Sequence, residues 1–346
     1  MNNENTVSTG LSAGDDILLD VKDLVVQYVL EDEVVEAVNG VSFSLRMGQA
    51  IGLVGETGAG KTTTALSIMN LVPDPPGVIK SGTISVCGSE ILKLGPRQLQ
   101  KIRGKDVSMI FQDPMTSLNP VTTVGNQIAE SVKLHENVTK TQAYDRAVEM
   151  LELVGIPGER AAEYPHQFSG GMKQRVVIAI ALACNPRVLI ADEPTTALDV
   201  TIQAQVLDMI NDLKRKFNTS LLMITHDLGV VARMCDEVMV MYAGRIVESG
   251  TREDVFNRTK HPYTEGLFNS LPNLDDRKSK LKPIPGLMPD PTKLPAGCAF
   301  APRCLYATET CSERLPELRS MSDTHCVACL AYDDPDFRIE RWGDNG

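Results

Sequence analysis

The sequence is poor in aromatic residues and positive charge, and it lacks long hydrophobic runs. Only 5% of its 346 residues are aromatic, and the net charge is −11. An acidic chain argues against a protein that coats nucleic acid. The longest apolar candidate, VVIAIALACNPRVLIA, is interrupted by Asn185, Pro186 and Arg187, so no stretch reaches the roughly 18 to 20 residues of a membrane-spanning helix. We therefore expect no nucleic-acid partner, and contact with a membrane only through other proteins.

Cysteine is sparse over most of the chain, and the first residues do not resemble a secretory signal. Residues 1–16 have neither a basic start nor an apolar core, and we expect them to form a disordered polar tail. Cys87, Cys184 and Cys235 stand apart in apolar surroundings. The other five cysteines, Cys298, Cys304, Cys311, Cys326 and Cys329, fall within 32 residues. In a cytosolic protein, such a cluster favours metal binding over disulfides.

The hydrophobic pattern indicates strands of two kinds with helices between them. VSFSL alternates, with Val41, Phe43 and Leu45 on one side, as in a half-buried strand. Three other runs are apolar throughout: AIGLV (50–54), RVLIAD (187–192) and SLLMITH (220–226). Such runs are typical of central strands in a parallel sheet that is covered on both faces. With helical patterns between them, the main domain is predicted to be α/β.

Two regions depart from this alternation. Residues 113–168 are predicted to be mostly helical, with apolar residues at helical spacing up to Val154 and a helix-ending Gly155. After residue 260 the composition changes, and KPIPGLMPDPTKLPAG carries five prolines in sixteen residues. We therefore expect an inserted helical subdomain over about 113–168 and a C-terminal extension over 261–346 that holds the cysteine cluster.

The strongest motif is GETGAGKT at residues 55–62, between an expected buried strand and an expected helix. It matches Gly-x-x-x-x-Gly-Lys-Thr, in which glycines let backbone N–H groups surround phosphate oxygens at a helix N-terminus. Lys61 can bridge the β- and γ-phosphates, and the hydroxyl of Thr62 can bind Mg²⁺. The residues predicted to bind ATP here are Gly55, Glu56, Thr57, Gly58, Ala59, Gly60, Lys61, Thr62 and Thr63.

A pair of carboxylates, Asp192 and Glu193, follows the apolar run VLIA. A nucleoside triphosphatase needs a metal ligand and a group that activates water. Asp192 ends the expected strand, where it can hold Mg²⁺, and Glu193 is placed to act as general base on the attacking water. Alone, such a pair is more often part of a solvated loop, but next to a phosphate-binding loop we interpret it as catalytic.

A second helix-start anion site lies upstream of this pair, in FSGGMKQR at residues 168–175. Ser169 is suited to cap the helix, and Gly170 and Gly171 follow it. The motifs and their order resemble those of ABC-transporter ATPases over residues 17–260. In that family the serine and glycines form the signature motif, which contacts ATP.

The resemblance implies a fold, an assembly and further site residues. The fold would be a P-loop NTPase of the ABC type, with an antiparallel β subdomain, the inserted helical subdomain and the extension. Two such domains would pack head to tail, the P-loop of one facing the signature motif of the other. Taken singly, Gln112 could be a surface amide, His226 a core histidine and Tyr28 a core ring. The implied roles are adenine stacking for Tyr28, ATP contact for Asp199, catalysis for Gln112, Glu193 and His226, and Mg²⁺ binding for Thr62, Gln112 and Asp192.

Three further segments narrow the resemblance. FQDPMTSLNP, HPYTEGLFNSLP and PAGCAFAPRC are similar to segments in ATP-binding subunits of bacterial oligopeptide and dipeptide permeases, with nickel importers as close relatives. This implies a peripheral ATPase on the cytoplasmic face of the membrane, paired with a second and different ATPase chain. The other partners would be two transmembrane permease subunits and, indirectly, an extracytoplasmic solute-binding protein. The transported solute stays open. The alternatives are the ATPase of a nickel or other small-solute importer, a non-transport ABC ATPase, and a regulatory subunit whose own site hydrolyses ATP poorly.

The same resemblance suggests an iron–sulfur cluster in the extension. The implied ligands, Cys298-x5-Cys304-x6-Cys311-x17-Cys329, would hold a [4Fe–4S] centre. Cys326 would be a spare or competing ligand. Structural zinc and unligated thiols are the alternatives, because thiolates select either zinc or iron–sulfur clusters.

Overall fold

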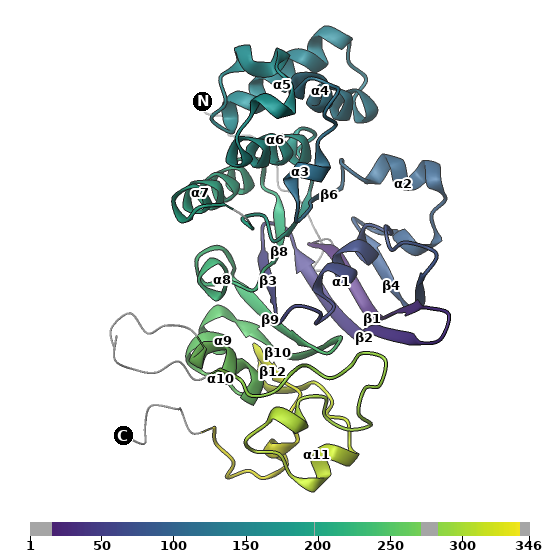
Figure 1. Ribbon diagram of the computed structural model, residues 1–346, viewed down its shortest axis with the longest axis vertical. Helices are drawn as coiled ribbons and strands as arrows, with labels where there is room; N and C mark the ends of the chain where they lie inside the picture. The colour runs from purple at the N-terminus through teal and green to yellow at the C-terminus, as the bar shows by residue number, and fades with distance from the viewer. Residues whose placement is uncertain (1–15, 197, 271–282, 340–346) are drawn as a thin grey trace, which may run out of the picture.

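The computed structural model describes residues 16–196, 198–270 and 283–339 (Figure 1). The predicted disordered tail therefore lies outside the described residues, except for Asp16. Within them, an antiparallel sheet stands beside a larger central sheet, helices cover the central sheet, and the C-terminal residues pack at the end opposite the helical region. The α/β prediction is confirmed.

The antiparallel sheet is built mainly from two long strands. Val41 and Leu45 of the alternating segment are buried, and Phe43 is half-buried. The order is β2-β1-β4-β5, with β1 at Ile17–Val29, β2 at Val34–Arg46, β4 at Gly77–Val86 and β5 at Ser89–Glu90. This sheet packs over α1, so one hydrophobic core joins it to the central sheet.

The central sheet carries the three apolar runs. Every residue of β3, β7 and β8 is buried, as expected for strands covered on both faces. Strands β6, β7, β8, β3 and β9 are parallel neighbours, and β10, β12 and β11 continue the sheet antiparallel. The bounds are β3 Ala50–Val54, β6 Val107–Ile110, β7 Val188–Asp192, β8 Ser220–Ile224, β9 Glu237–Tyr242, β10 Arg245–Thr251, β11 Arg319–Ser322 and β12 His325–Val327.

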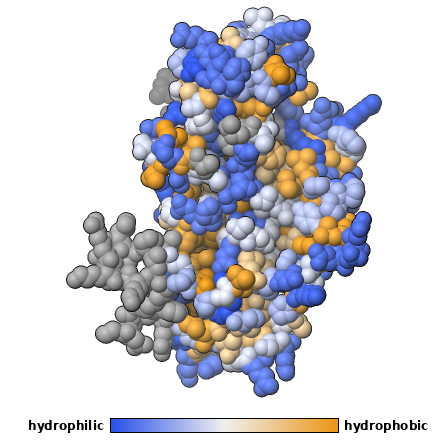
Figure 2. All heavy atoms as spheres, in the orientation of Figure 1, coloured by the Kyte–Doolittle hydropathy of each residue, from blue (hydrophilic) through white to orange (hydrophobic). Residues whose placement is uncertain are grey.

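The helices fall into groups along the long axis of the molecule (Figure 1). Helices α3 to α6 form the end drawn uppermost, where α4 packs against α5. The bounds are α1 Lys61–Ile68, α2 Pro96–Ile102, α3 Pro114–Ser117, α4 Val124–His135, α5 Lys140–Leu153, α6 Gly170–Leu182, α7 Val200–Phe217, α8 Leu228–Met234, α9 Arg252–Asn257, α10 Pro262–Asn269 and α11 Glu309–Glu313. Among the described residues, none of the helices combines the length and hydrophobicity needed to cross a membrane. Figure 2 shows one face of the molecule as largely hydrophilic, with scattered hydrophobic patches.

The C-terminal residues are joined to the central sheet. Strand β12 pairs with β10, so that Cys326 lies opposite Ser249 and His325 opposite Gly250. Inside this junction, the carboxylate of Glu248 is fully buried and contacts Nε2 of His325 at 2.8 Å. It also accepts hydrogen bonds from the backbone N–H groups of Lys260 and His261.

Candidate active site

The glycine loop connects the carboxyl end of β3 to the start of α1. Gly55, Gly58 and Gly60 all have positive φ angles. At Gly60, with φ of 102°, a Cβ atom would lie 2.3 Å from the carbonyl oxygen of Ala37, so only glycine fits. Thr57 and Gly58 are exposed, whereas Ala59 is buried and anchors the loop. The strand–loop–helix context that the motif requires is present.

Lys61 lies under this loop, at the first position of α1. Its Nζ atom donates hydrogen bonds to the carbonyl oxygens of Gly55 at 2.7 Å and Glu56 at 3.0 Å. Burial lowers the pKa of Lys61, and the nearby carboxylates of Glu193 and Asp192 partly oppose that shift. The ammonium is therefore held inside the loop and faces the two carboxylates.

Asp192 ends β7 and is almost completely buried. Burial raises its pKa, and a hydrogen bond with the side chain of Thr62 acts in the opposite direction. Its Oδ1 atom has no hydrogen-bond partner among the described residues. A buried, unpartnered carboxylate oxygen beside a hydroxyl suits a hard divalent cation such as Mg²⁺.

Glu193 is the centre of a small cluster of polar side chains. Its carboxylate accepts hydrogen bonds from Nε2 of Gln112 and from Oγ1 of Thr196, both at 3.0 Å. Nδ1 of His226 lies 3.0 Å from the other carboxylate oxygen. The structure thus brings together the three residues predicted to be catalytic, although they come from three separate segments of the chain.

The protonation of Glu193 follows from these contacts. Burial would raise the pKa of its carboxyl, but the hydrogen bonds with His226 and Thr196 outweigh burial and hold the pKa below its usual value. Glu193 is therefore ionised at neutral pH, which is the form that a general base requires. Gln112, which was also predicted to bind Mg²⁺, directs its amide to Glu193.

The predicted signature motif lies in a different hollow. Ser169 caps α6, and Asp199 caps α7 through a 3.0 Å hydrogen bond from the N–H of Ile202. These caps share a hollow of about 510 Å³, which is also lined by Gly170 and Gly171. No glycine-loop residue is among its described lining residues. Among the described residues, the signature motif therefore lines a hollow to which the glycine loop does not contribute.

Tyr28 lies at the end of β1 beside the start of α1. Its hydroxyl is 3.3 Å from Oγ1 of Thr63. A half-buried aromatic ring at this position borders the helix that follows the glycine loop.

Three residues that the sequence interpretation did not single out also belong to this site. Thr196 donates to Glu193; its only signal is a hydroxyl three residues after the predicted base. Tyr263 accepts a hydrogen bond from the N–H of Glu56, and Arg303 pairs with the Glu56 carboxylate. Both lie in segments that carry the family resemblance, but nothing in the sequence points them toward a loop more than 200 positions away.

The four predicted thiol ligands are neighbours in the extension. The N–H of Cys298 donates to the carbonyl oxygen of Cys311 at 2.7 Å. Burial raises the pKa of the Cys329 thiol to about 12, and the thiols of Cys304, Cys298 and Cys311 add to the shift. Among the described residues, however, no group of three or more His, Cys, Asp or Glu side chains could hold a metal ion as placed.

Comparison with known proteins identifies the family. The ABC transporter family model matches residues 38–196, and the model of the oligopeptide/dipeptide transporter C-terminal region matches residues 247–311. The oligopeptide transport ATP-binding protein OppD of Bacillus subtilis is 52% identical over 313 residues, covering 90% of this chain and 87% of that protein. The chain belongs to the ABC ATP-binding subunits of oligopeptide and dipeptide transporters. This confirms the resemblance predicted from the motifs.

Other relatives and solved structures agree with this assignment. OppD of Escherichia coli is 50% identical, covering 91% of this chain and 93% of that protein. The dipeptide transport protein DppD of Bacillus subtilis is 48% identical, covering 91% and 95%. The dimeric structure of MJ0796, a bacterial ABC transporter cassette, matches with a TM-score of 0.61 and 25% identity, covering 68% of this chain and 98% of that one. The predicted ABC-type fold and ATPase activity are confirmed.

Proposed function

We propose that this chain is the ATPase subunit of a membrane importer that takes up dipeptides or oligopeptides. Its relatives carry names that state oligopeptide or dipeptide transport, and they match along 90% or more of the chain. The observation that carries the proposal is the carboxylate of Glu193, which contacts Gln112, Thr196 and His226 next to the buried Asp192. A base held in this way beside a phosphate-binding loop suits hydrolysis of a terminal phosphate.

In the proposed reaction, the amides of residues 55–61 and the ammonium of Lys61 bind the phosphates. Thr62, Asp192 and Gln112 would hold Mg²⁺, which neutralises phosphate charge when bound. Glu193 accepts a proton from the water that attacks the γ-phosphorus. Gln112 and His226 position the carboxylate for that transfer, and Tyr28 stacks on the adenine.

The proposed site is completed by a second ATPase subunit. Ser169, Gly170, Gly171 and Asp199 line one hollow, and that hollow contains no glycine-loop residue among the described ones. In a head-to-tail dimer, this hollow would face the nucleotide on the partner's P-loop. ATP would bind the closed dimer better than the open one, and hydrolysis would release the two subunits.

The remaining parts of the assembly follow from the family. We propose that the chain is a peripheral subunit on the cytoplasmic face of the membrane, docked on two transmembrane permease subunits. The partner ATPase would be a different chain, and an extracytoplasmic solute-binding protein would act indirectly by selecting the solute. Co-purification with permease subunits rather than with ribosomes would support this assembly.

The four neighbouring thiols support a metal centre in the extension. In a [4Fe–4S] centre each thiolate binds a different iron, so the sulfur atoms need not converge on one point as they do around zinc. We propose Cys298, Cys304, Cys311 and Cys329 as its ligands, and assign it no step in hydrolysis. Iron and zinc analysis of anaerobically purified protein, with its visible absorption spectrum, distinguishes cluster, zinc and free thiols.

The base assignment is tested by Glu193→Gln. This variant keeps the size of the side chain but removes its proton-accepting charge, so MgATP binding should persist while turnover falls to background. Glu237→Gln, which changes an acidic residue elsewhere at the start of β9, is a matched control that should retain turnover. Undiminished hydrolysis by the Glu193 variant would remove it from the mechanism.

A further inference from the structure

Glu56, the second residue of the glycine loop, is held by three separate hydrogen-bonding contacts. Its carbonyl oxygen accepts from Nζ of Lys61 at 3.0 Å. Its N–H donates to the hydroxyl of Tyr263 at 2.9 Å, and its carboxylate pairs with the guanidinium of Arg303. Two of these three partners come from the C-terminal part of the chain, outside the residues matched by the ABC transporter model.

The contact with Arg303 is a two-point ion pair. Nη1 donates to one carboxylate oxygen at 2.8 Å, and Nη2 donates to the other at 3.1 Å. Nε donates to the carbonyl oxygen of Pro285 at 2.9 Å, and Nη1 lies 3.3 Å from the hydroxyl of Tyr242. Only 7% of the Arg303 side chain is exposed. The geometry suits a planar guanidinium and would not be reproduced by a lysine ammonium.

The Arg303 contact belongs to a packed aromatic cluster. The rings of Tyr242 and Tyr263 lie 4.5 Å apart, and Phe300 packs against both at 5.3 and 5.4 Å. Tyr242 ends β9, which neighbours the β3 strand that leads into the loop. The guanidinium therefore reaches the loop from a fixed position rather than from a mobile tail.

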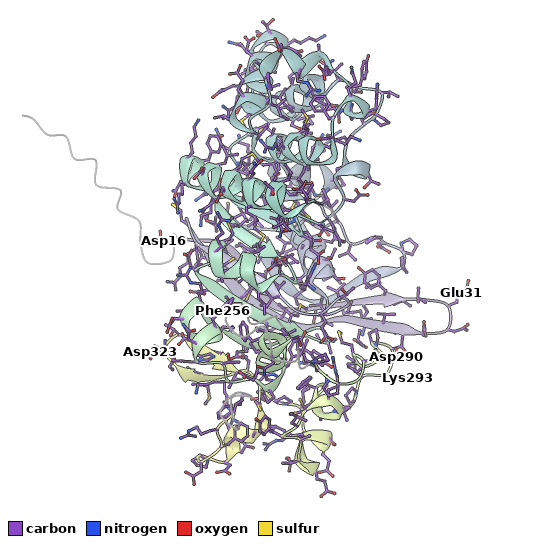
Figure 3. All side chains as sticks on the ribbon, turned by 60° about the vertical axis from the view of Figure 1, so that its left-hand side comes forward. Asp16, Glu31, Phe256, Asp290, Lys293 and Asp323 are labelled. Carbon is purple, nitrogen blue, oxygen red and sulfur yellow. The ribbon has the colours of Figure 1, made fainter. Side chains whose placement is uncertain are left out.

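The extension also contacts the other end of the predicted nucleotide site. The carbonyl oxygen of Pro291 accepts a hydrogen bond from the N–H of Glu36 at 2.9 Å. Its neighbours Asp290 and Lys293 lie beside the long β1–β2 hairpin that ends at Glu31 (Figure 3). The proline-rich segment thus borders the strand that pairs with the Tyr28 end of β1.

We propose that Arg303 is a positioning residue for nucleotide binding. It fixes the carboxylate of Glu56, and through the Glu56 carbonyl it fixes the ammonium of Lys61 and the first turn of the loop. The affinity for a nucleotide's phosphates therefore depends on the extension. This inference rests on the proposed nucleotide site, in which Lys61 and the loop amides bind the phosphates.

The test measures binding of Mg-ADP to the purified full chain by titration calorimetry, with thermal unfolding in parallel. Arg303→Met keeps the length of the side chain but loses its charge and donors. We expect it to raise the Kd about tenfold, which is within the range for mutations that change coupling between sites. Arg303→Lys keeps the charge but not the two-point geometry, and its Kd should lie between those of the wild type and Arg303→Met.

Matched variants distinguish an effect of Arg303 on the glycine loop from an effect on the overall stability of the protein. Arg314→Met changes an extension arginine that pairs with Asp333, far along the chain from the loop, and should bind Mg-ADP like the wild type. Glu56→Gln should weaken binding as Arg303→Met does. The double variant should bind no more weakly than either single variant, because both changes break one contact.

Several outcomes would overturn the inference. If Arg303→Met lowers the melting temperature but leaves the Kd for Mg-ADP unchanged, Arg303 stabilises the fold without positioning the loop. If the effects of Arg303→Met and Glu56→Gln on the Kd add up in the double variant, Arg303 does not act through Glu56. If Arg303→Met does not fold, Arg303→Lys and Glu56→Gln decide in the same titration. Lys61→Ala tests the proposed nucleotide site independently of Arg303. Unchanged binding of Mg-ADP in that variant would refute the nucleotide site itself.

Discussion

The hydrogen bond from Thr196 to Glu193 predicts a measurable change in the pH dependence of hydrolysis. Thr196→Val preserves the shape of the side chain and removes the hydroxyl that donates to the carboxylate at 3.0 Å. The remaining contacts of Glu193, with Gln112 and His226, are left in place. The variant therefore isolates one of the interactions that keep the pKa of the base low.

The size of the effect follows from the strength of that bond. Hydrogen bonds to charged groups contribute about 1.5 to 3 kcal/mol, and a pKa change of one unit corresponds to about 1.4 kcal/mol. Thr196 is exposed, so water replaces part of the lost donor and the lower end applies. We expect the pKa of Glu193 to rise when this hydrogen bond is lost, because the ionised carboxylate is the form that the hydroxyl stabilises.

The sign of the pH effect is fixed by the role of the carboxylate. A base is active when ionised, so activity is lost as the pH falls through its pKa. A higher pKa in Thr196→Val moves the fall in activity on the acidic side of the pH profile, its acid limb, to higher pH, whereas turnover on the neutral plateau changes little. The rate of phosphate release at saturating MgATP, measured from acidic to neutral pH, shows directly the pH at which activity falls.

A neighbouring residue supplies the control. The side chain of Thr195 makes no hydrogen bond within the described part of the chain, so Thr195→Val should leave the acid limb in place. If activity falls at the same pH in Thr196→Val and in the wild type while Glu193→Gln is inactive, the Thr196 hydroxyl does not lower the pKa of Glu193. A fall in activity at lower pH in Thr196→Val than in the wild type would contradict the predicted direction of the pKa change.

Two further predictions concern the backbone of the loop and the junction with the extension. Gly60→Ala places a Cβ 2.3 Å from the carbonyl oxygen of Ala37 and should abolish Mg-ADP binding, whereas Gly58→Ala, whose Cβ meets nothing within 4 Å, should weaken it far less in the same calorimetric titration. His325→Leu leaves the buried carboxylate of Glu248 without its side-chain partner and should destabilise the protein by about 3 to 5 kcal/mol in urea unfolding. The double variant with Glu248→Leu should recover only part of that loss, because it removes the unpartnered carboxylate but leaves the backbone N–H groups of Lys260 and His261 without their acceptor. An equal loss in the double variant would contradict this reasoning.

Much of the central fold could be predicted because its signals are local. The apolar runs at 50–54, 187–192 and 220–226 correspond to β3, β7 and β8 within one or two residues. A strand that is covered on both faces must be apolar at every position, so a short apolar run bounded by turn or helix signals indicates it. The carboxyl ends of parallel strands lie at one edge of the sheet, which explains why Asp192, Glu193 and His226 meet the glycine loop.

The contacts of the extension could not be predicted in this way. Arg303 and Glu56 are 247 residues apart, and neither lies in a periodic pattern that would orient it toward the other. Strands β11 and β12 have only four and three residues, too few to give a reliable alternation. Their positions depend on partners that a local pattern does not contain: the edge of β10 for β12, and a buried carboxylate for His325.

These contacts make the ATPase core structurally dependent on the C-terminal extension. The composition changes near residue 260, but β10 ends just before that point and is paired on one side by β12 from the extension. Without the extension, Glu248 would lose its contact with His325, Glu56 would lose Arg303, and an edge of the central sheet would be left open. Because these losses would unpair the buried carboxylate of Glu248 and the half-buried carboxylate of Glu56, the extension is part of the structure that supports the glycine loop.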